Sequence, residues 1–263
     1  MRLYVEVARS SFRRYLAYRA ATLAGLFTNS VFGVLFASVY LALYQDRQTG
    51  ASVAGFTITE LLTFVWISQS VIAVVGLWGW WEIAQSIQSG DVVSDLMKPF
   101  NYYGYWVARD VGRAGAQLMM RGVPTFLVGA LLYDVAMPRQ AANWPLFAAS
   151  VALAIGVSFG LRFLLNISAF WLMDVTGIGS LSAAVINLLS GMLLPLAFFP
   201  GWFETTANLL PFRAVITSPA QAYLGHGNVA LVLLGQTVWL VILVLAGLGS
   251  LRLVTRRVVV QGG

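Results

Sequence analysis

The chain has 263 residues, of which 59% are hydrophobic and only 10% are charged, and its formal net charge is +6. A soluble globular domain normally carries about 25% charged residues, so this composition excludes a soluble enzyme and a peripheral protein with one anchor. The absence of cysteine excludes disulfide scaffolds and thiolate metal sites, and the single histidine, His226, excludes a histidine metal cluster within one chain. We therefore predict no metal site.

Residues 1–19 predict an amphipathic helix that lies on the cytosolic surface of a membrane. On a helical wheel the apolar residues gather on one side, and they are Tyr4, Val5, Val7, Ala8, Phe12, Tyr15 and Leu16. The opposite side carries Arg2, Glu6, Arg9 and Arg13. A basic amphipathic helix of this kind lies along the inner leaflet with its arginines toward anionic headgroups. It is either a topology anchor alone or an interfacial helix that also helps to hold a cytosolic partner.

Six apolar runs are candidates for crossing the membrane, because a helix needs about 20 residues to span a hydrocarbon core of about 30 Å. They are residues 20–43, 61–79, 114–133, 146–167, 178–196 and 229–251. Strands of a transmembrane barrel alternate in polarity, whereas these runs are apolar on every face. We therefore predict an all-α integral membrane protein with six transmembrane helices in a single domain over residues 1–263.

The basic residues predict the orientation of this domain. Five arginines precede the first run, three basic residues lie in the loop 80–113, and three arginines lie in the C-terminal tail. The other side holds only Arg47, Arg139 and Arg213. Because Lys and Arg are in excess on the cytoplasmic side of membrane proteins, both termini are predicted to be cytoplasmic.

The loop 80–113 is the only sizeable cytosolic connection in this topology. Its residues from Glu82 to Ser89 favour a helix, Gly90 ends it, and Pro99 interrupts the chain again. A short cytosolic helix of this kind suits a groove on another protein, or it only packs on the bundle. The candidate contact residues are Glu82, Gln85, Ile87, Gly90, Asp91, Leu96 and Pro99.

Residues 195–227 are too polar to span the membrane and too apolar for an exterior loop. The prolines Pro195, Pro200, Pro211 and Pro219 divide the segment into pieces of one to three helical turns. We predict a re-entrant helical pair in the outer leaflet, with Trp202 and Tyr223 at headgroup depth, where amphipathic rings collect.

Charged residues within the runs are candidates for function. Arg121 lies seven residues into the third run, about 10 Å deep at 1.5 Å per residue, and Arg162 lies near the cytosolic end of the fourth. Either arginine could instead extend its side chain toward the cytosol. Asp174 could pair with a basic neighbour, His226 is interpreted as a loop residue, and no acidic residue is expected well inside a run.

Nucleotide and hydrolase motifs are absent from the sequence. It has no Gly-x-Ser-x-Gly, no His-Glu-x-x-His and no G-x-x-x-x-G-K-[ST], since Lys98 is the only lysine. The chain therefore does not hydrolyse a nucleotide through the last motif, and a partner would have to supply energy for uphill transport.

Three stretches carry a resemblance to a known family. They are SGDVVSDLMKPFNYYGYWVARD (89–110), LRFLLNISAFWLMDVTGI (161–178) and LLSGMLLPLAFFPGWFETTANLLPFRAVITSPAQAYLG (188–225). With the order of the predicted elements, the chain resembles the type-2 ABC exporter permeases over its whole length. The match is closest to a bacterial subgroup of roughly 260-residue permeases, often encoded as two related permeases beside one ATPase.

This resemblance implies a permease in the bacterial cytoplasmic membrane, surrounded by lipid and paired with a second permease, the same chain or a related one. Two cytosolic ABC ATPase subunits would contact residues 82–99, supported by the N-terminal helix. No cofactor is expected on this chain, no residue is expected to be catalytic, and ATP and Mg²⁺ would bind the ATPase. No nucleic acid is expected as a partner. The subgroup points to export of drugs, antibiotics or other amphipathic compounds.

Two other readings remain open from the residues. An ion-coupled carrier or channel would show inverted repeats or buried carboxylates. A membrane-embedded enzyme of lipid-linked substrates would cluster acidic, His or Ser residues near one membrane face, whereas the ten carboxylates here are scattered along the chain.

Overall fold

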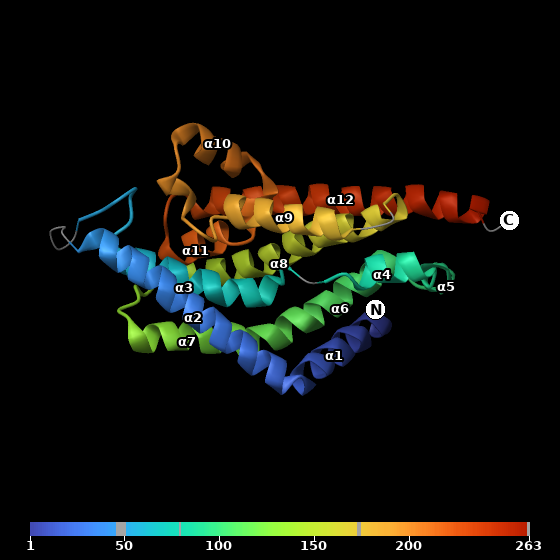
Figure 1. Ribbon diagram of the computed structural model, residues 1–263, viewed down its shortest axis with the longest axis horizontal. Helices are drawn as coiled ribbons and strands as arrows, with labels where there is room; N and C mark the ends of the chain where they lie inside the picture. Colours follow the sequence, from blue (N-terminus) through green and yellow to red (C-terminus); the bar gives the residue numbers. More distant parts are fainter. Residues whose placement is uncertain (46–50, 79, 173–174, 262–263) are drawn as a thin grey trace.

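The computed structural model describes residues 1–45, 51–78, 80–172 and 175–261, and over these ranges the chain is helical without a β-strand (Figure 1). The long helical stretches contain α2 (Arg19–Tyr44), α3 (Ile58–Val75), α6 (Tyr102–Gln117), α7 (Val123–Leu132), α8 (Asn143–Ile167) and α12 (Val229–Gln261). The other helices are α1 (Arg2–Ala17), α4 (Glu82–Ser89), α5 (Val92–Leu96), α9 (Thr176–Leu189), α10 (Gly201–Leu209) and α11 (Thr217–Leu224). A single π-helical turn, η1 (Leu118–Gly122), joins α6 to α7, and we call it the π-turn. The 3₁₀ turns are η2 (Ser168–Phe170), η3 (Leu196–Phe198) and η4 (Pro211–Ala214).

Five helical stretches are long and apolar enough to cross a membrane: Arg19–Tyr44, Ile58–Val75, Tyr102–Leu132, Asn143–Phe170 and Val229–Thr255. The chain is therefore a multi-pass membrane protein. The predicted run 178–196 is shorter in the structure, because its helix α9 has 14 residues and ends at Leu189. At 1.5 Å per residue, α9 is about 21 Å long, less than the hydrocarbon thickness.

The third predicted run, residues 114–133, falls in a helical stretch that starts before it. The helix begins twelve residues earlier at Tyr102, where the Asn101 side chain accepts a hydrogen bond of 2.7 Å from the Gly104 N–H. An Asn at this position satisfies one of the free N–H groups of a helix start. The second half of the expected cytosolic loop is therefore the first part of a continuous helical stretch.

A π-turn interrupts this stretch at Leu118–Gly122, immediately before Pro124. Proline has no N–H and its ring collides with the carbonyl four residues earlier, which here is the carbonyl of Met120. A wider turn relieves this collision without ending the helix. The π-turn carries Arg121, so the proline also determines where this charge lies.

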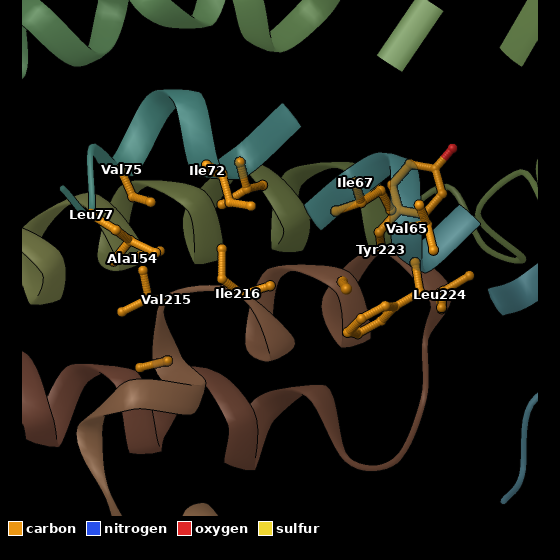
Figure 2. Close-up of a cluster of buried hydrophobic side chains, with 14 of the residues drawn as sticks. Val65, Ile67, Ile72, Val75, Leu77, Ala154, Val215, Ile216, Tyr223 and Leu224 are labelled. Atoms are coloured by element: carbon orange, nitrogen blue, oxygen red, sulfur yellow. The ribbon is translucent and has the colours of Figure 1, made fainter. Parts of the chain in front are cut away.

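Helix α3 lies at the centre of the core, and its entire second half is buried. It starts with a reciprocal cap, in which Thr57 accepts from the Glu60 N–H and the Glu60 carboxylate accepts from the Thr57 N–H at 2.9 Å. A helix that is apolar all round is expected inside a bundle. Figure 2 shows its side chains packed against α8 and residues 215–224.

The two ends of the molecule differ in their elements (Figure 1). The N-terminus, α4, α5 and the end of α12 lie at one end, which we call the α4 end. Helices α10 and α11 lie toward the opposite end, which we call the α10 end. The residues Arg47, Gly79 and Asp174, on which three of the predictions rest, lie outside the described part of the chain.

Candidate functional site

Helices α4 and α5 form a short hairpin, which projects at the α4 end (Figure 1). Gly90 joins them with a φ of 84°, a left-handed conformation that favours glycine and ends α4. The inner side of the hairpin is anchored by Ile83, Ala84 and Val92, which are at most 3% exposed. The hairpin is therefore attached firmly to the bundle beneath it.

The predicted contact residues divide between the two sides of this hairpin. Gln85, Gly90, Asp91 and Pro99 are exposed. Ile87 and Leu96 are only partly exposed, because both pack against the buried clusters under the hairpin.

Val93 and Met97, two apolar residues of the hairpin that the sequence analysis did not single out, are 43% and 82% exposed. They follow each other at a spacing of four residues, which places them on one helical face. The spacing is visible in the sequence, but their exposure is not, because the neighbouring Leu96 is equally apolar and packs inward.

Glu82 connects the hairpin to two other helices. Its carboxylate lies 2.5 Å from the Arg109 guanidinium of α6 and 3.7 Å from that of Arg14 in α1. The Arg109 guanidinium also stacks over the Trp106 ring, 4.6 Å from its centroid. Displacement of α4 would therefore be transmitted to α1 and α6.

Helix α1 packs lengthwise against α6, so it does not contact lipid alone. The Ser11 hydroxyl donates a 2.7 Å hydrogen bond to the Arg109 carbonyl, and the backbone of Ala8 lies so close to Gly112 that a Cβ there would collide with it. Leu3 and Val5 remain 48% and 59% exposed. The helix thus combines a face held by the bundle with apolar residues available to a membrane or partner.

Lys98 and Asp95 form a pair at the C-terminal end of α5. The Lys98 ammonium donates a 2.6 Å hydrogen bond to the Asp95 carboxylate, which raises the pKa of Lys98 above its ordinary value. Lys98 therefore stays charged at neutral pH. As an exposed pair, it contributes little to stability.

Directly beneath the hairpin lies a buried ion network of Asp110, Arg113 and Arg162, which are 3%, 6% and 4% exposed. The Asp110 carboxylate accepts from both ends of the Arg162 guanidinium at 3.0 and 2.9 Å, and from the Arg113 Nε at 2.7 Å. Paired hydrogen bonds of this kind fix both distance and orientation.

The network also holds the end of α3. Arg113 donates to the carbonyls of Val74 and Val75 at 2.9 and 3.2 Å, and Ser158 donates to the Val75 carbonyl at 2.9 Å. These carbonyls belong to the last turn of α3, where no intrahelical donor is left for them. The network therefore joins α3, α6 and α8 at one point.

Two predictions are corrected by this network. Arg162 does not extend its side chain to the cytosol, because Asp110 of α6 neutralises it inside the bundle. Asp110 was assigned to a cytosolic loop, yet it is a buried carboxylate within a candidate span. The spacing of Asp110 and Arg113 could have suggested their pair, whereas Arg162 lies 52 residues away in sequence.

A cavity of about 450 Å³ lies between the hairpin, α8 and α9. Its lining includes the rings of Trp78, Trp80 and Trp81 together with the amides of Gln85 and Asn166. Such a mixture of aromatic surface and a few hydrogen-bonding groups is typical of sites for small organic ligands.

Arg121 also lies against a neighbouring helix. Its guanidinium donates a 3.3 Å hydrogen bond to the Asn29 side chain of α2, and the Asn29 amide in turn donates to the Gln69 carbonyl of α3 at 3.0 Å. Arg121 is thus linked directly to α2 and through Asn29 to α3, and it remains a candidate for function.

The segment 195–227 forms the short pieces that its prolines predict. Pro195 and Pro200 directly precede η3 and α10, Pro211 begins η4, and Pro219 lies in the first turn of α11. Proline is tolerated at these positions because the first N–H groups of a helix have no partner within it.

Of the two rings predicted at headgroup depth, Trp202 is 73% exposed, whereas Tyr223 does not reach the surface. Tyr223 is 1% exposed, and its ring makes edge-to-face contacts with Phe126, Trp144 and Phe147 at centroid distances of 5.3–5.9 Å. This favourable geometry keeps Tyr223 in the core.

His226 takes part in a polar cluster at the α10 end. Its Nε2 lies 3.0 Å from the Glu60 carboxylate, which also binds the Arg139 guanidinium at 2.7 Å. His226 lies in the turn that follows α11, and its contact with Glu60 holds this turn against the start of α3. The sequence pattern did not indicate this cluster, although Thr57 and Glu60 have the spacing of a helix cap.

Comparison with protein families matches residues 31–262 to the family described as "ABC-2 family transporter protein". No curated protein matches the chain.

Proposed function

This chain belongs to the ABC-2 family of transporter proteins, and from that premise we propose that it is the permease subunit of an ATP-driven exporter of amphipathic compounds. Permeases of this family are transport components that associate with an ABC ATPase and form dimers. In this proposal two ATPase subunits bind ATP and Mg²⁺ and drive a pair of permeases. The α4–α5 hairpin receives their movement.

The observation that carries this proposal is the construction of the hairpin. Its inner side is buried, while Val93 and Met97 present apolar surface outward. Through Glu82 the hairpin is linked to α1 and α6, and the Asp110 network directly beneath it joins α6 to α3 and α8. An ATPase that displaced this hairpin would therefore move several helices as a rigid body.

We propose six spans with both termini in the cytosol, α9 forming the fifth together with the residues that follow it. Leu181 and Leu188 of α9 are 66% and 41% exposed, and they are seven residues apart on one helical face. A second permease would cover this face. The cavity lies on the opposite side of α9, where Gly179, Ser180 and Ala183 line it, and amphipathic compounds would enter there. The α10 end then faces the exterior, with residues 195–227 as a re-entrant pair.

The purified chain should not hydrolyse ATP above a detergent blank, because it lacks a phosphate-binding loop. Hydrolysis should appear when the ATPase subunit is added. Robust hydrolysis by a preparation free of other proteins would contradict the assignment as a permease subunit.

Cysteine labelling should distinguish the two ends, since the chain has no cysteine of its own. In intact cells a membrane-impermeant maleimide should label Trp202→Cys and should leave Met97→Cys unlabelled until the cells are opened. Tyr223→Cys should react poorly on both sides because Tyr223 is buried. Labelling of Met97→Cys in intact cells would reverse the proposed orientation.

A further inference from the structure

A second cavity, of about 270 Å³, lies where α1, α2, α3 and the π-turn meet. The residues that matter in its lining are Tyr15, Asn29, Trp78, Arg113, Gln117 and Arg121. Its lining holds two arginines, Arg113 and Arg121, and no carboxylate, whereas the cavity beside α9 is lined by one arginine, Arg162.

Two polar atoms of this lining are buried without a hydrogen-bond partner among the described residues: the Arg121 Nε and the Gln117 Oε1. The Asn29 oxygen accepts from Arg121 at 3.3 Å, and no described carboxylate lies within 4.0 Å of this guanidinium. Burying a hydrogen-bond donor without an acceptor costs free energy, and the cost is larger when the donor is charged. The guanidinium therefore has capacity for a further acceptor.

The charges around this cavity are also unbalanced. Asp110 is shared by Arg113 and Arg162, so the buried network keeps one excess positive charge. Arg121 adds a second at the same cavity. A bound anion would offset these two positive charges, which burial destabilises. It would also accept a hydrogen bond from the unpaired donor of Arg121.

The surroundings of the cavity favour a lipid as the source of this anion. The π-turn that carries Arg121 also exposes Leu118 and Met119, at 41% and 63%, and Phe27 of α2 is 71% exposed. In a membrane protein such faces contact acyl chains. Trp78, 42% exposed at the cavity, is of the type that collects at headgroup depth. A polar cavity beside apolar outer faces matches a charged headgroup with its acyl chains.

We propose that this cavity binds the phosphate headgroup of an anionic phospholipid, with Arg121 as the main ligand and Gln117 as a hydrogen-bond partner of the headgroup. The bound lipid would join α2 to the π-turn of the neighbouring stretch. This site is independent of the identity of the exported compound and of the ATPase.

The test is a titration of the purified full chain, held in phosphatidylcholine-containing detergent micelles, with phosphatidylglycerol. Its unfolding midpoint should rise with phosphatidylglycerol and not with added phosphatidylcholine, since a ligand that binds only the folded state stabilises it. Arg121→Gln should weaken the apparent affinity about tenfold or more, because hydrogen bonds to charged groups are worth about 1.5–3 kcal/mol.

Arg252→Gln is the matched control. Arg252 is an exposed arginine of α12 that does not line the cavity, so its variant should keep the wild-type affinity within about twofold, as expected for a charge away from the site. Arg121→Lys keeps the charge but loses the planar fork, and it should bind several-fold more weakly than wild type. This variant also serves if Arg121→Gln does not fold.

Two results would overturn the proposal. The first is an equal stabilisation of wild type, Arg121→Gln and Arg121→Lys by phosphatidylglycerol, or none at all, which would mean that the cavity binds no anionic lipid. The second is a stabilisation by inorganic phosphate, dependent on Arg121, that is as strong as the effect of the lipid, which would make the site one for a free oxyanion.

Discussion

Asp110→Asn is expected to lower the free energy of unfolding by about 3–5 kcal/mol, the cost of removing one partner from a buried ion pair. The change leaves Arg113 and Arg162 as two buried cations without an anion, and it replaces one of the two acceptor oxygens between α6 and α8 with an amide donor. Denaturant unfolding in mixed micelles, followed by circular dichroism, measures this change. Asp91→Asn is the matched control, because Asp91 is exposed, and it should change stability by about 0.5 kcal/mol or less.

The charges left in the buried network after each substitution predict an order of stability among further variants. Arg162→Met leaves the neutral pair of Asp110 and Arg113, so it should cost less than Asp110→Asn. The double variant Asp110→Asn/Arg162→Met leaves only one buried cation, so it should be more stable than Asp110→Asn alone. Such coupling is what a double-mutant cycle detects. Simple addition of the two single effects would show that these side chains do not interact as the structure places them.

Val93→Asp and Met97→Asp should each reduce the affinity for the ATPase about tenfold to a hundredfold. Burying an apolar side chain of this size is worth about 1.5–3 kcal/mol, and 1.4 kcal/mol corresponds to a factor of ten. Because both side chains point outward, the variants should keep the wild-type unfolding midpoint. Binding of purified ATPase to each variant in micelles, compared with wild type, measures the loss.

Met137→Asp provides the control at the α10 end. Met137 is 68% exposed between α7 and α8, so the same substitution there should leave ATPase binding unchanged. Normal ATPase binding by both hairpin variants would show that the hairpin is not the ATPase contact. Proline at Ile87 is a less specific test, because Ile87 packs inward and a loss of core packing would resemble a lost contact.

The sequence predicted the features that depend on local pattern. Long apolar runs indicated membrane-spanning helices, and the stretches 89–110, 161–178 and 188–225 indicated the family that the comparison then showed. Gly90 and the prolines of residues 195–227 marked where helices end and begin, because each restricts the backbone at its own position.

Other features of the candidate site depend on contacts between distant parts of the chain. Ile87 and Met97 are both apolar, and only the packing of the hairpin determines that the first points inward and the second outward. The sequence predicted the hairpin as a contact, but it could not give which of its apolar side chains are exposed.

The sequence by itself determined the class of protein, the approximate helices and the family, since hydrophobicity and backbone restrictions act over a few residues. Only the tertiary structure decided which charges meet. It placed Asp110 against Arg162 and Glu60 against Arg139, which are 52 and 79 residues apart. The reason is that the energy of an ion pair depends on distance and burial, and both are fixed by the packing of helices that are remote in the chain.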